Sequence, residues 1–185
     1  MKILKTTDIL PGKWLTLKET TFKTKSGYEH TWRFVERTGM PEIVSVIVRS
    51  DKTGKILLIR QTRVPIEMDI IEFPAGLVDA NESLETAAIR EVKEETGYLI
   101  SINDISPATP KSPGLTNETV HLVQASSSES NSGELKLDET EEITSFWVHP
   151  DEFFEWINQE ELKDTAVSND VYAFMLGYKL KKSMN

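Results

Sequence analysis

Cysteine is absent from this chain of 185 residues. The chain therefore has neither disulfide bridges nor thiolate metal ligands. No stretch approaches the ~18 consecutive apolar residues of a membrane span, and the opening segment MKILKTTDILPGKW lacks the apolar core of a signal peptide. The three histidines, at positions 30, 121 and 149, lack the spacing of a metal site. We expect a cytoplasmic protein with no membrane partner.

Positive charge is also scarce, because 21 lysines and arginines face 30 aspartates and glutamates, for a net charge of −9. Nucleic-acid backbones select for basic surfaces, so no nucleic-acid partner is expected. An anionic substrate would have to be met by local arginines and by a metal ion. The length and a hydrophobic content of 38% suit one sizeable domain with a small appended layer.

The most informative stretch is GLVDANESLETAAIREVKEETGY, residues 76–98. Ser83 is a suitable N-cap, and Gly97 can adopt the left-handed conformation that commonly ends a helix. These signals predict a helix from Leu84 to Thr96.

One face of this helix begins apolar and ends in three carboxylates. With ~100° per residue, a single stripe holds six side chains: Leu84, Ala87, Ala88, Glu91, Glu94 and Glu95. Desolvating like charges is costly unless something compensates, and Mg²⁺ prefers oxygen ligands of this kind. The alternative is a solvated acidic face with Arg90 and Lys93 as local partners.

The spacing of the charged residues favours the metal site. Gly76 is followed after five residues by Glu82, after seven more by Arg90-Glu91, and then by Glu94-Glu95 and Gly97. This pattern resembles the Nudix box at every defined position. The resemblance implies a hydrolase that cleaves a nucleoside diphosphate linked to another group, with divalent metal bound by the box glutamates.

The remaining chain reads as strands with two further helices. Alternating or aliphatic patterns predict strands at 14–22, 28–37, 43–49, 55–61, 98–105 and 119–125. The segment 69–76 predicts a short buried strand that runs into a tight turn at Pro74-Ala75-Gly76. A turn is expected at Lys25-Ser26-Gly27, and helices are expected after Pro150 and after Ser168 or Asn169. The polar segment SSSESNSG, residues 126–133, predicts a mobile surface loop.

Several residues outside the box carry two interpretations each. Trp14 and Trp32 either pack in the core or stack on a planar base. Arg63 follows a strand and precedes Val-Pro, so it either clamps a phosphate or forms an exposed salt bridge. Glu72 on an apolar strand needs a partner, which is either a cation or Arg90.

Two further groups are candidates for the chemistry itself. The Ala75 carbonyl lies in a tight turn before the box helix and is a possible additional metal ligand. The late acidic segment DETEEIT carries Glu139, Glu141 and Glu142, which could supply a general base from a loop that closes on substrate. The alternative for each of these acids is a solvated loop.

Resemblance beyond the box narrows the subgroup. The RQTR segment at 60–63, the EFPAG segment at 72–76 and Pro113, sixteen residues after Gly97, are similar to ADP-ribose pyrophosphatases. The likeness runs from Gly12 to Lys179. It implies an α/β (α+β) Nudix fold, with a mixed β-sheet sandwiched between helices and a small N-terminal antiparallel β unit. It divides the chain into residues 1–40, for dimerisation and adenine contacts, and residues 41–185, the hydrolase domain.

The same resemblance implies a homodimer with composite active sites. Adenine would stack between Trp14 and Trp32. Metal would lie on the Ala75 carbonyl and two glutamates, with a third close by. The implied metal set is Ala75, Glu91, Glu94 and Glu95; the implied substrate contacts are Trp14, Trp32, Arg37, Arg63, Glu72 and Pro113; and the implied catalytic set is Glu142, Glu94, Glu141 and Arg90. Arg33 and Ser112 depart from a human member of the subgroup, which has acids at both positions.

The expected reaction is attack of water on a phosphorus of ADP-ribose, which gives AMP and ribose 5-phosphate. Two or three Mg²⁺ ions, or Mn²⁺, would neutralise the diphosphate while Glu142 takes the proton of the water, with Glu141 and Glu139 as alternatives. Other ADP-sugars are further expected substrates. The alternative functions are hydrolysis of oxidised purine nucleoside diphosphates such as 8-oxo-dGDP, and a non-catalytic sensor that binds ADP-ribose.

Overall fold

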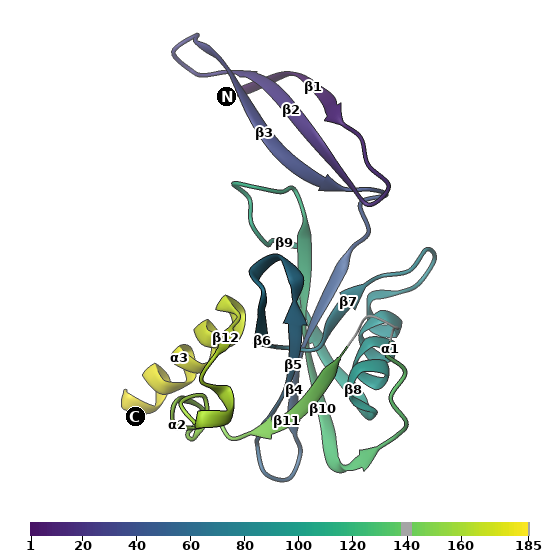
Figure 1. The fold of residues 1–185 in the computed structure, drawn as a ribbon, viewed down its shortest axis with the longest axis vertical. Helices are drawn as coiled ribbons and strands as arrows, with labels where there is room; N and C mark the ends of the chain where they lie inside the picture. Colours follow the sequence, from purple (N-terminus) through teal and green to yellow (C-terminus); the bar gives the residue numbers. More distant parts are fainter. Residues whose placement is uncertain (138–141, 185) are drawn as a thin grey trace.

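The computed structural model describes residues 1–137 and 142–184. Within these residues the chain forms a small sheet of three strands that projects from a larger body, in which a mixed sheet lies between helices (Figure 1). The mixed sheet sandwiched between helices confirms the predicted fold class. No helix in the described ranges is both long and apolar enough to cross a membrane.

The N-terminal sheet is antiparallel and consists of β1 (Lys2–Leu10), β2 (Leu15–Lys23) and β3 (Glu29–Arg37). Strand β1 was not predicted. The turn between β2 and β3 lies where it was expected, with Gly27 at a φ of 91°. There the amide of Thr24 donates to the carbonyl of Tyr28 at 2.8 Å, and this bond closes the hairpin.

The larger sheet contains nine strands in the described part of the chain, and six of them form the path β12-β6-β5-β4-β10-β8. The strands are β4 (Ile43–Ser50), β5 (Ile56–Arg63), β6 (Met68–Glu72), β7 (Ala75–Leu77), β8 (Tyr98–Ile105), β9 (Thr109–Pro110), β10 (Thr119–Ser132), β11 (Ile143–Val148) and β12 (Thr165–Val167). Strands β4 and β10 are parallel, as are β6 and β12, and the other pairs are antiparallel. The sheet is therefore mixed.

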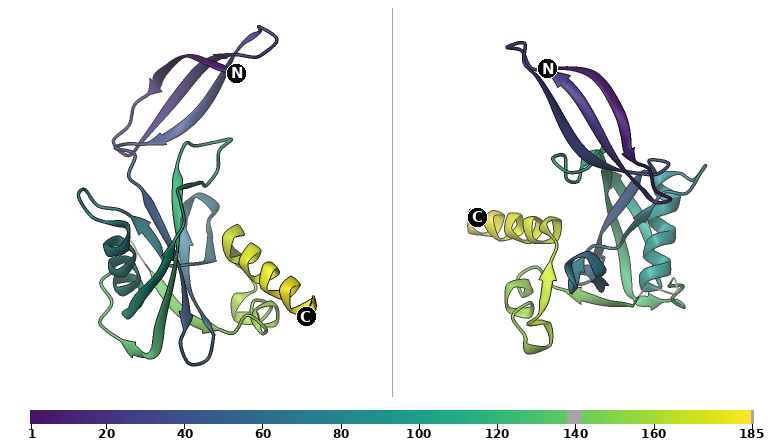
Figure 2. Two further views of the ribbon diagram at one scale, coloured as in Figure 1. Left: turned by 180° about the vertical axis from the view of Figure 1, so that it is seen from behind. Right: turned by 45° about the horizontal axis from the view of Figure 1, so that its top comes forward.

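Helices cover both faces of this sheet (Figure 2). Helix α1 (Leu84–Thr96) packs Ala87, Ala88 and Val92 on one core cluster with residues of β4 and β10. The short helix α2 (Phe153–Trp156) and the longer α3 (Asn169–Ser183) pack on the other face, around Phe153 and Met175. Because β4 and β5 are buried on both faces, their sequences are continuous aliphatic runs instead of alternating ones.

Three local expectations were wrong. The tight turn expected at Pro74-Ala75-Gly76 instead leads into a second strand, because β6 ends at Glu72 and Ala75–Leu77 pairs with β4. The helix expected after Pro150 is reduced to the four residues of α2. The polar segment expected to be a mobile loop instead extends β10 to Ser132, where Ser127 donates through Oγ to the carbonyl of Leu99 at 2.7 Å.

Candidate active site

Helix α1 begins and ends where its sequence signals place it. The amide of Thr86 donates to Oγ of Ser83 at 3.2 Å, which caps the first turn. Gly97 has a φ of 73°, and its amide donates to the carbonyl of Lys93 at 2.9 Å. The predicted helix from Leu84 to Thr96 is confirmed, so the angular positions of its carboxylates are fixed as well.

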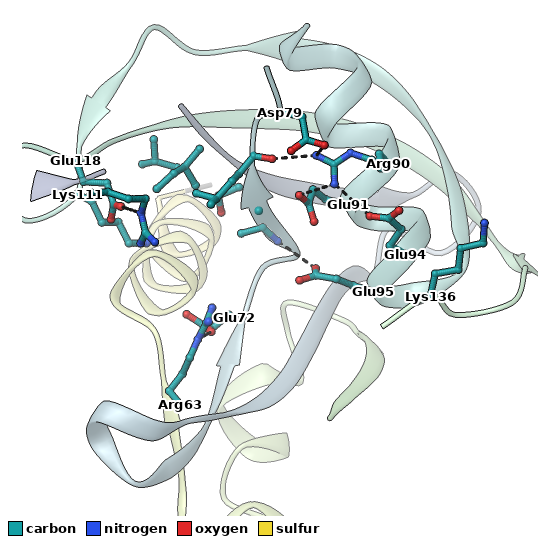
Figure 3. A pocket seen from close by; sticks show the side chains of 17 residues that line it. Arg63, Glu72, Asp79, Arg90, Glu91, Glu94, Glu95, Lys111, Glu118 and Lys136 are labelled. Atoms are coloured by element: carbon teal, nitrogen blue, oxygen red, sulfur yellow. Dashed lines mark hydrogen bonds and ion pairs between the residues drawn. The ribbon is translucent and has the colours of Figure 1, made fainter. Parts of the chain in front are cut away.

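The carboxylates of α1 form one wall of a cavity of about 770 Å³ (Figure 3). Glu91, Glu94 and Glu95 line it together with Ala75 and Gly76. Glu95 is buried, with 5% of its surface exposed, and accepts a hydrogen bond from the amide of Ala75 at 3.2 Å. The acidic stripe therefore faces a cavity and not bulk solvent.

Arg90 is the local counter-charge of this wall. Its guanidinium donates to Glu82 at 2.8 and 3.0 Å, to Glu91 at 2.8 Å and to Glu94 at 3.1 Å, and also to the carbonyl of Leu77 at 2.9 Å. The hydrogen bond from Arg90 lowers the pKa of Glu82, and the bond to Glu82 is the largest cause of the raised pKa of Arg90. One cation thus binds three carboxylates of the box. The alternative interpretation of the acidic face, in which Arg90 is a local partner of these acids, is therefore correct in part.

Gly76 has to be glycine for a steric reason. A Cβ atom at this position would lie 2.0 Å from Cδ of Glu91. The absence of a side chain therefore leaves the space that the Glu91 carboxylate occupies between α1 and β7.

The donor set suits a hard divalent cation in its chemistry. Carboxylates of Glu91, Glu94 and Glu95 and the Ala75 carbonyl offer oxygen ligands, which Mg²⁺ prefers together with water and substrate phosphate. Within residues 1–137 and 142–184, no three acidic or histidine side chains already converge as a metal cage. Arg90 engages two of the glutamates, and Glu95 accepts a hydrogen bond from a backbone amide.

The opposite wall of the cavity carries cations, each paired with an acid from another element. Arg37 Nε lies 2.7 Å from Glu118, and Arg63 Nε lies 2.7 Å from Glu72. Glu72 therefore has Arg63 as its partner, and the proposed pairing of Glu72 with Arg90 is wrong. Arg63 lines the cavity, as expected of a residue that clamps a phosphate, and it also forms a half-exposed salt bridge with Glu72.

Lys111 completes this wall, and sequence reasoning missed it. Its Nζ atom lies 3.1 Å from Asp170 at the start of α3. Lys111 and Glu118 are adjacent through a backbone hydrogen bond of 3.1 Å. Glu118 was missed too, because its partner Arg37 lies 81 residues away in the chain. The one sequence signal for Lys111 was its position two residues before Pro113 in an irregular loop.

Both N-terminal tryptophans are exposed, so the interpretation that they pack in the core is wrong. Trp14 and Trp32 have 70% and 54% of their surfaces exposed. Trp32 donates through Nε1 to the carbonyl of Gly114 at 3.2 Å and, with Pro113, lines a separate apolar cavity of about 540 Å³. Neither tryptophan is among the described residues that line the acidic cavity.

The two tryptophans are also far apart within one chain. The carbonyl of Trp14 accepts a hydrogen bond from the amide of Thr38, so these two residues are neighbours. Thr38 lies six positions after Trp32, along β3 and the residue that follows it. At ~3.3 Å per residue this separation is about 20 Å, too long for a sandwich around one base. A base held between two such tryptophans would need a second copy of the chain.

The structure does not bring the expected general base to the cavity. Glu142 is exposed, directly precedes β11, and is not among the described residues that line the cavity. The alternatives Glu139 and Glu141 lie outside the described residues. Arg33, one of the departures from the subgroup, pairs with Glu19 at 2.9 Å on the exposed N-terminal sheet.

Comparison with known proteins defines the class to which this fold and site belong. A model of the NUDIX domain matches residues 40–170. The chain belongs to the Nudix family of hydrolases.

Individual relatives carry more specific names. The chain is 37% identical to an ADP-ribose pyrophosphatase of Saccharomyces cerevisiae over 173 residues, which cover 85% of this chain and 75% of the yeast protein. It is 33% identical to the ADP-sugar pyrophosphatase of Mus musculus over 135 residues, or 69% of this chain and 62% of the mouse protein. A crystal structure of an ADP compounds hydrolase superposes with a TM-score of 0.70 at 23% identity, over 99% of this chain and 96% of its own, and shows a common fold.

Proposed function

We propose that this protein hydrolyses ADP-ribose, and other ADP-sugars, to AMP and a sugar phosphate in a reaction that depends on a divalent metal. The observation that carries the proposal is the polarity of the cavity. Three carboxylates of α1 form one wall, and Arg37, Arg63 and Lys111 belong to the other. A diphosphate needs both, because its oxygens bind cationic side chains and share a metal with carboxylates. The names of the yeast and mouse relatives support the choice of an ADP compound.

The reaction assigns distinct tasks to the two walls. Bound to Glu91, Glu94, Glu95 and the Ala75 carbonyl, Mg²⁺ or Mn²⁺ would neutralise the diphosphate and lower the pKa of water. Arg90 orients the glutamates through the hydrogen bonds that it donates to them. Arg90 and the glutamates are preorganised on a rigid helix, so the free-energy cost of reorganising them is small when charge develops on the reacting phosphate.

The arginines of the cationic wall bind the substrate by exchanging an acidic side chain for the diphosphate. Arg37 and Arg63 rest on Glu118 and Glu72 and would turn one or more N–H groups to the diphosphate. Glu142 is assigned the proton of the attacking water, with Glu141 as the alternative. Glu142 precedes β11, a strand that contacts α1, and the proposal requires its carboxylate to move to the box when substrate binds.

The proposal includes a homodimer. The N-terminal sheet projects from the body (Figures 1 and 2). Its strands β1–β3 expose large apolar side chains, and a small sheet of this kind needs a partner surface. A second copy would bring its Trp14 near Trp32 of the first, which a single chain does not achieve. Light scattering should give twice the mass of 21.0 kDa, and a monomer at micromolar concentration would argue against composite sites.

The function is tested with a substrate panel. We would incubate the protein with Mg²⁺ and, separately, ADP-ribose, ADP-glucose, NADH, GDP-mannose and 8-oxo-dGDP, and separate the products by chromatography. ADP-ribose should give AMP and ribose 5-phosphate with the highest kcat/KM. The matched control is the same panel with EDTA, which should abolish turnover.

The outcomes separate the alternatives. Preference for 8-oxo-dGDP would replace the proposal by hydrolysis of oxidised nucleotides. Binding of ADP-ribose in calorimetry without any products would indicate a sensor.

A further inference from the structure

Lys111 belongs to the cationic wall of the cavity, but the proposed reaction assigns it no task of its own. It follows β9, and its backbone amide donates to the carbonyl of Glu118 at 3.1 Å. In Figure 3 its side chain lies beside Glu118, across the cavity from the α1 carboxylates. Lys111 therefore belongs to the wall where Arg37 and Arg63 also present positive charge.

The resting partner of Lys111 does not depend on it. Asp170 accepts hydrogen bonds from the hydroxyl of Ser168 and, at 3.0 Å, from the amide of Val171. It also lies in the first turn of α3, where the helix dipole favours a negative charge. If Lys111 turns away, Asp170 still accepts hydrogen bonds from these donors. The movement of Lys111 therefore leaves no carboxylate without a hydrogen-bond partner.

The substrate carries negative charge that the cationic wall has to balance. The diphosphate of an ADP-sugar carries two negative charges. Arg37 and Arg63 are both balanced by acids at rest. A third mobile cation on the same wall adds positive charge for the bound diphosphate.

We propose that Lys111 is a substrate-binding residue that leaves Asp170 to contact the diphosphate of the nucleotide substrate. This inference rests on the proposed function for the identity of the substrate. A lysine suits the task because its ammonium is a compact charge on a flexible stem and can move between two acceptors. The side chain is 41% exposed, so burial does not lock it in place.

The test compares Lys111→Met with Lys111→Arg in steady-state kinetics on ADP-ribose. Loss of one charged hydrogen bond predicts a KM for Lys111→Met about tenfold higher, with kcat changed less. Lys111→Arg should restore most of the difference, because the charge returns. The matched control is Lys181→Met, which removes the same charge from an exposed position on α3 and should leave KM unchanged.

Asp170→Asn separates substrate binding from a structural tether. This variant keeps the oxygen that accepts from Ser168 and Val171 but loses the charge that holds Lys111 at rest. If Lys111 binds substrate, the KM of Asp170→Asn stays within about twofold of the wild type or falls. A KM raised as much as in Lys111→Met would make Lys111 a tether between the loop and α3 and would overturn the inference.

Calorimetric titration with ADP in metal-free buffer distinguishes this inference from the proposed function. A weaker Kd for Lys111→Met than for the wild type supports the role of Lys111, even if ADP-ribose is not hydrolysed. Normal hydrolysis of ADP-ribose with an unchanged KM in Lys111→Met would overturn the inference and leave the proposed function standing. A wild-type protein that binds neither ADP nor ADP-ribose would overturn both.

Discussion

Glu91, Glu94 and Glu95 are close together on one side of α1, and this arrangement would be unfavourable without positive charge nearby. Arg90 supplies that charge in the structure through bonds to Glu91 and Glu94, and Glu95 accepts from the amide of Ala75. Each carboxylate is therefore held by hydrogen bonds that a metal ion would share or replace. Substitution to glutamine changes the charge of a ligand while preserving its shape.

Glu91→Gln and Glu95→Gln should each lower kcat for ADP-ribose by about 100-fold or more, because electrostatic stabilisation of the reacting phosphate is lost. Folding should change little, as judged by Tm, since an amide oxygen still accepts the hydrogen bonds. Glu85→Gln is the matched control, because Glu85 is exposed on the same helix and does not line the cavity. An active variant at position 91 or 95 would contradict the assignment of the metal site.

Elements with their own start and stop signals were predictable from the sequence. Ser83 and Gly97 bound α1 at the expected residues. Strand β1 was missed because KILKTTDIL has little alternation and is exposed along most of its length. The serine-rich end of β10 was misread because its composition suggests a loop. There β10 pairs with β8, and the hydroxyls of Ser50 and Thr53 bond to Glu129.

The backbone of Gly97, at the end of α1, lies close to the backbone of Gly133, which follows β10. A Cβ at Gly97 would lie 2.5 Å from the carbonyl oxygen of Gly133, in addition to the strain of an alanine at a φ of 73°. Gly27, with a φ of 91° and no atom within 4 Å of an added Cβ, shares the strain without the overlap.

Gly97→Ala should lower the free energy of unfolding by at least about 2 kcal/mol, and Gly27→Ala by about 1 kcal/mol. Urea denaturation followed by circular dichroism measures both. The difference between the two variants reports the close approach of α1 and β10. Equal losses would mean that the backbone near Gly133 yields to the added methyl group.

At the scale of the whole molecule, the cavity joins segments that are distant in the chain. The acidic wall was predictable because Glu91, Glu94 and Glu95 come from one helix with a defined spacing. The pairs Arg37–Glu118 and Lys111–Asp170 were not, because each joins residues separated by 59 or more positions. Only the folded topology brings β3, the loop after β9 and α3 to one wall.

Acid stability also depends on contacts between distant segments. Glu129 on β10 accepts hydrogen bonds from Ser50, at 2.6 Å, and from Thr53 in the hairpin between β4 and β5. The bond from Ser50, with that from Thr53, lowers the pKa of Glu129 below its ordinary value of 4.5. Hydrogen bonds at Glu82 and Glu36 lower the pKa of each in the same way.

A carboxylate whose pKa is lowered on folding stabilises the native state at pH values above its unfolded pKa, and this contribution is lost as the pH falls through the folded pKa. The wild-type protein should therefore lose stability steadily below a pH of about 4.5. Glu129→Gln removes one titrating group, so its free energy of unfolding should be lower at pH 7 and should decline less steeply in acid. Urea denaturation at a series of pH values measures this slope, with Glu85→Gln as the exposed control. Parallel slopes for Glu129→Gln and the wild type would show that the contact between β10 and the β4–β5 hairpin does not depend on the charge of Glu129.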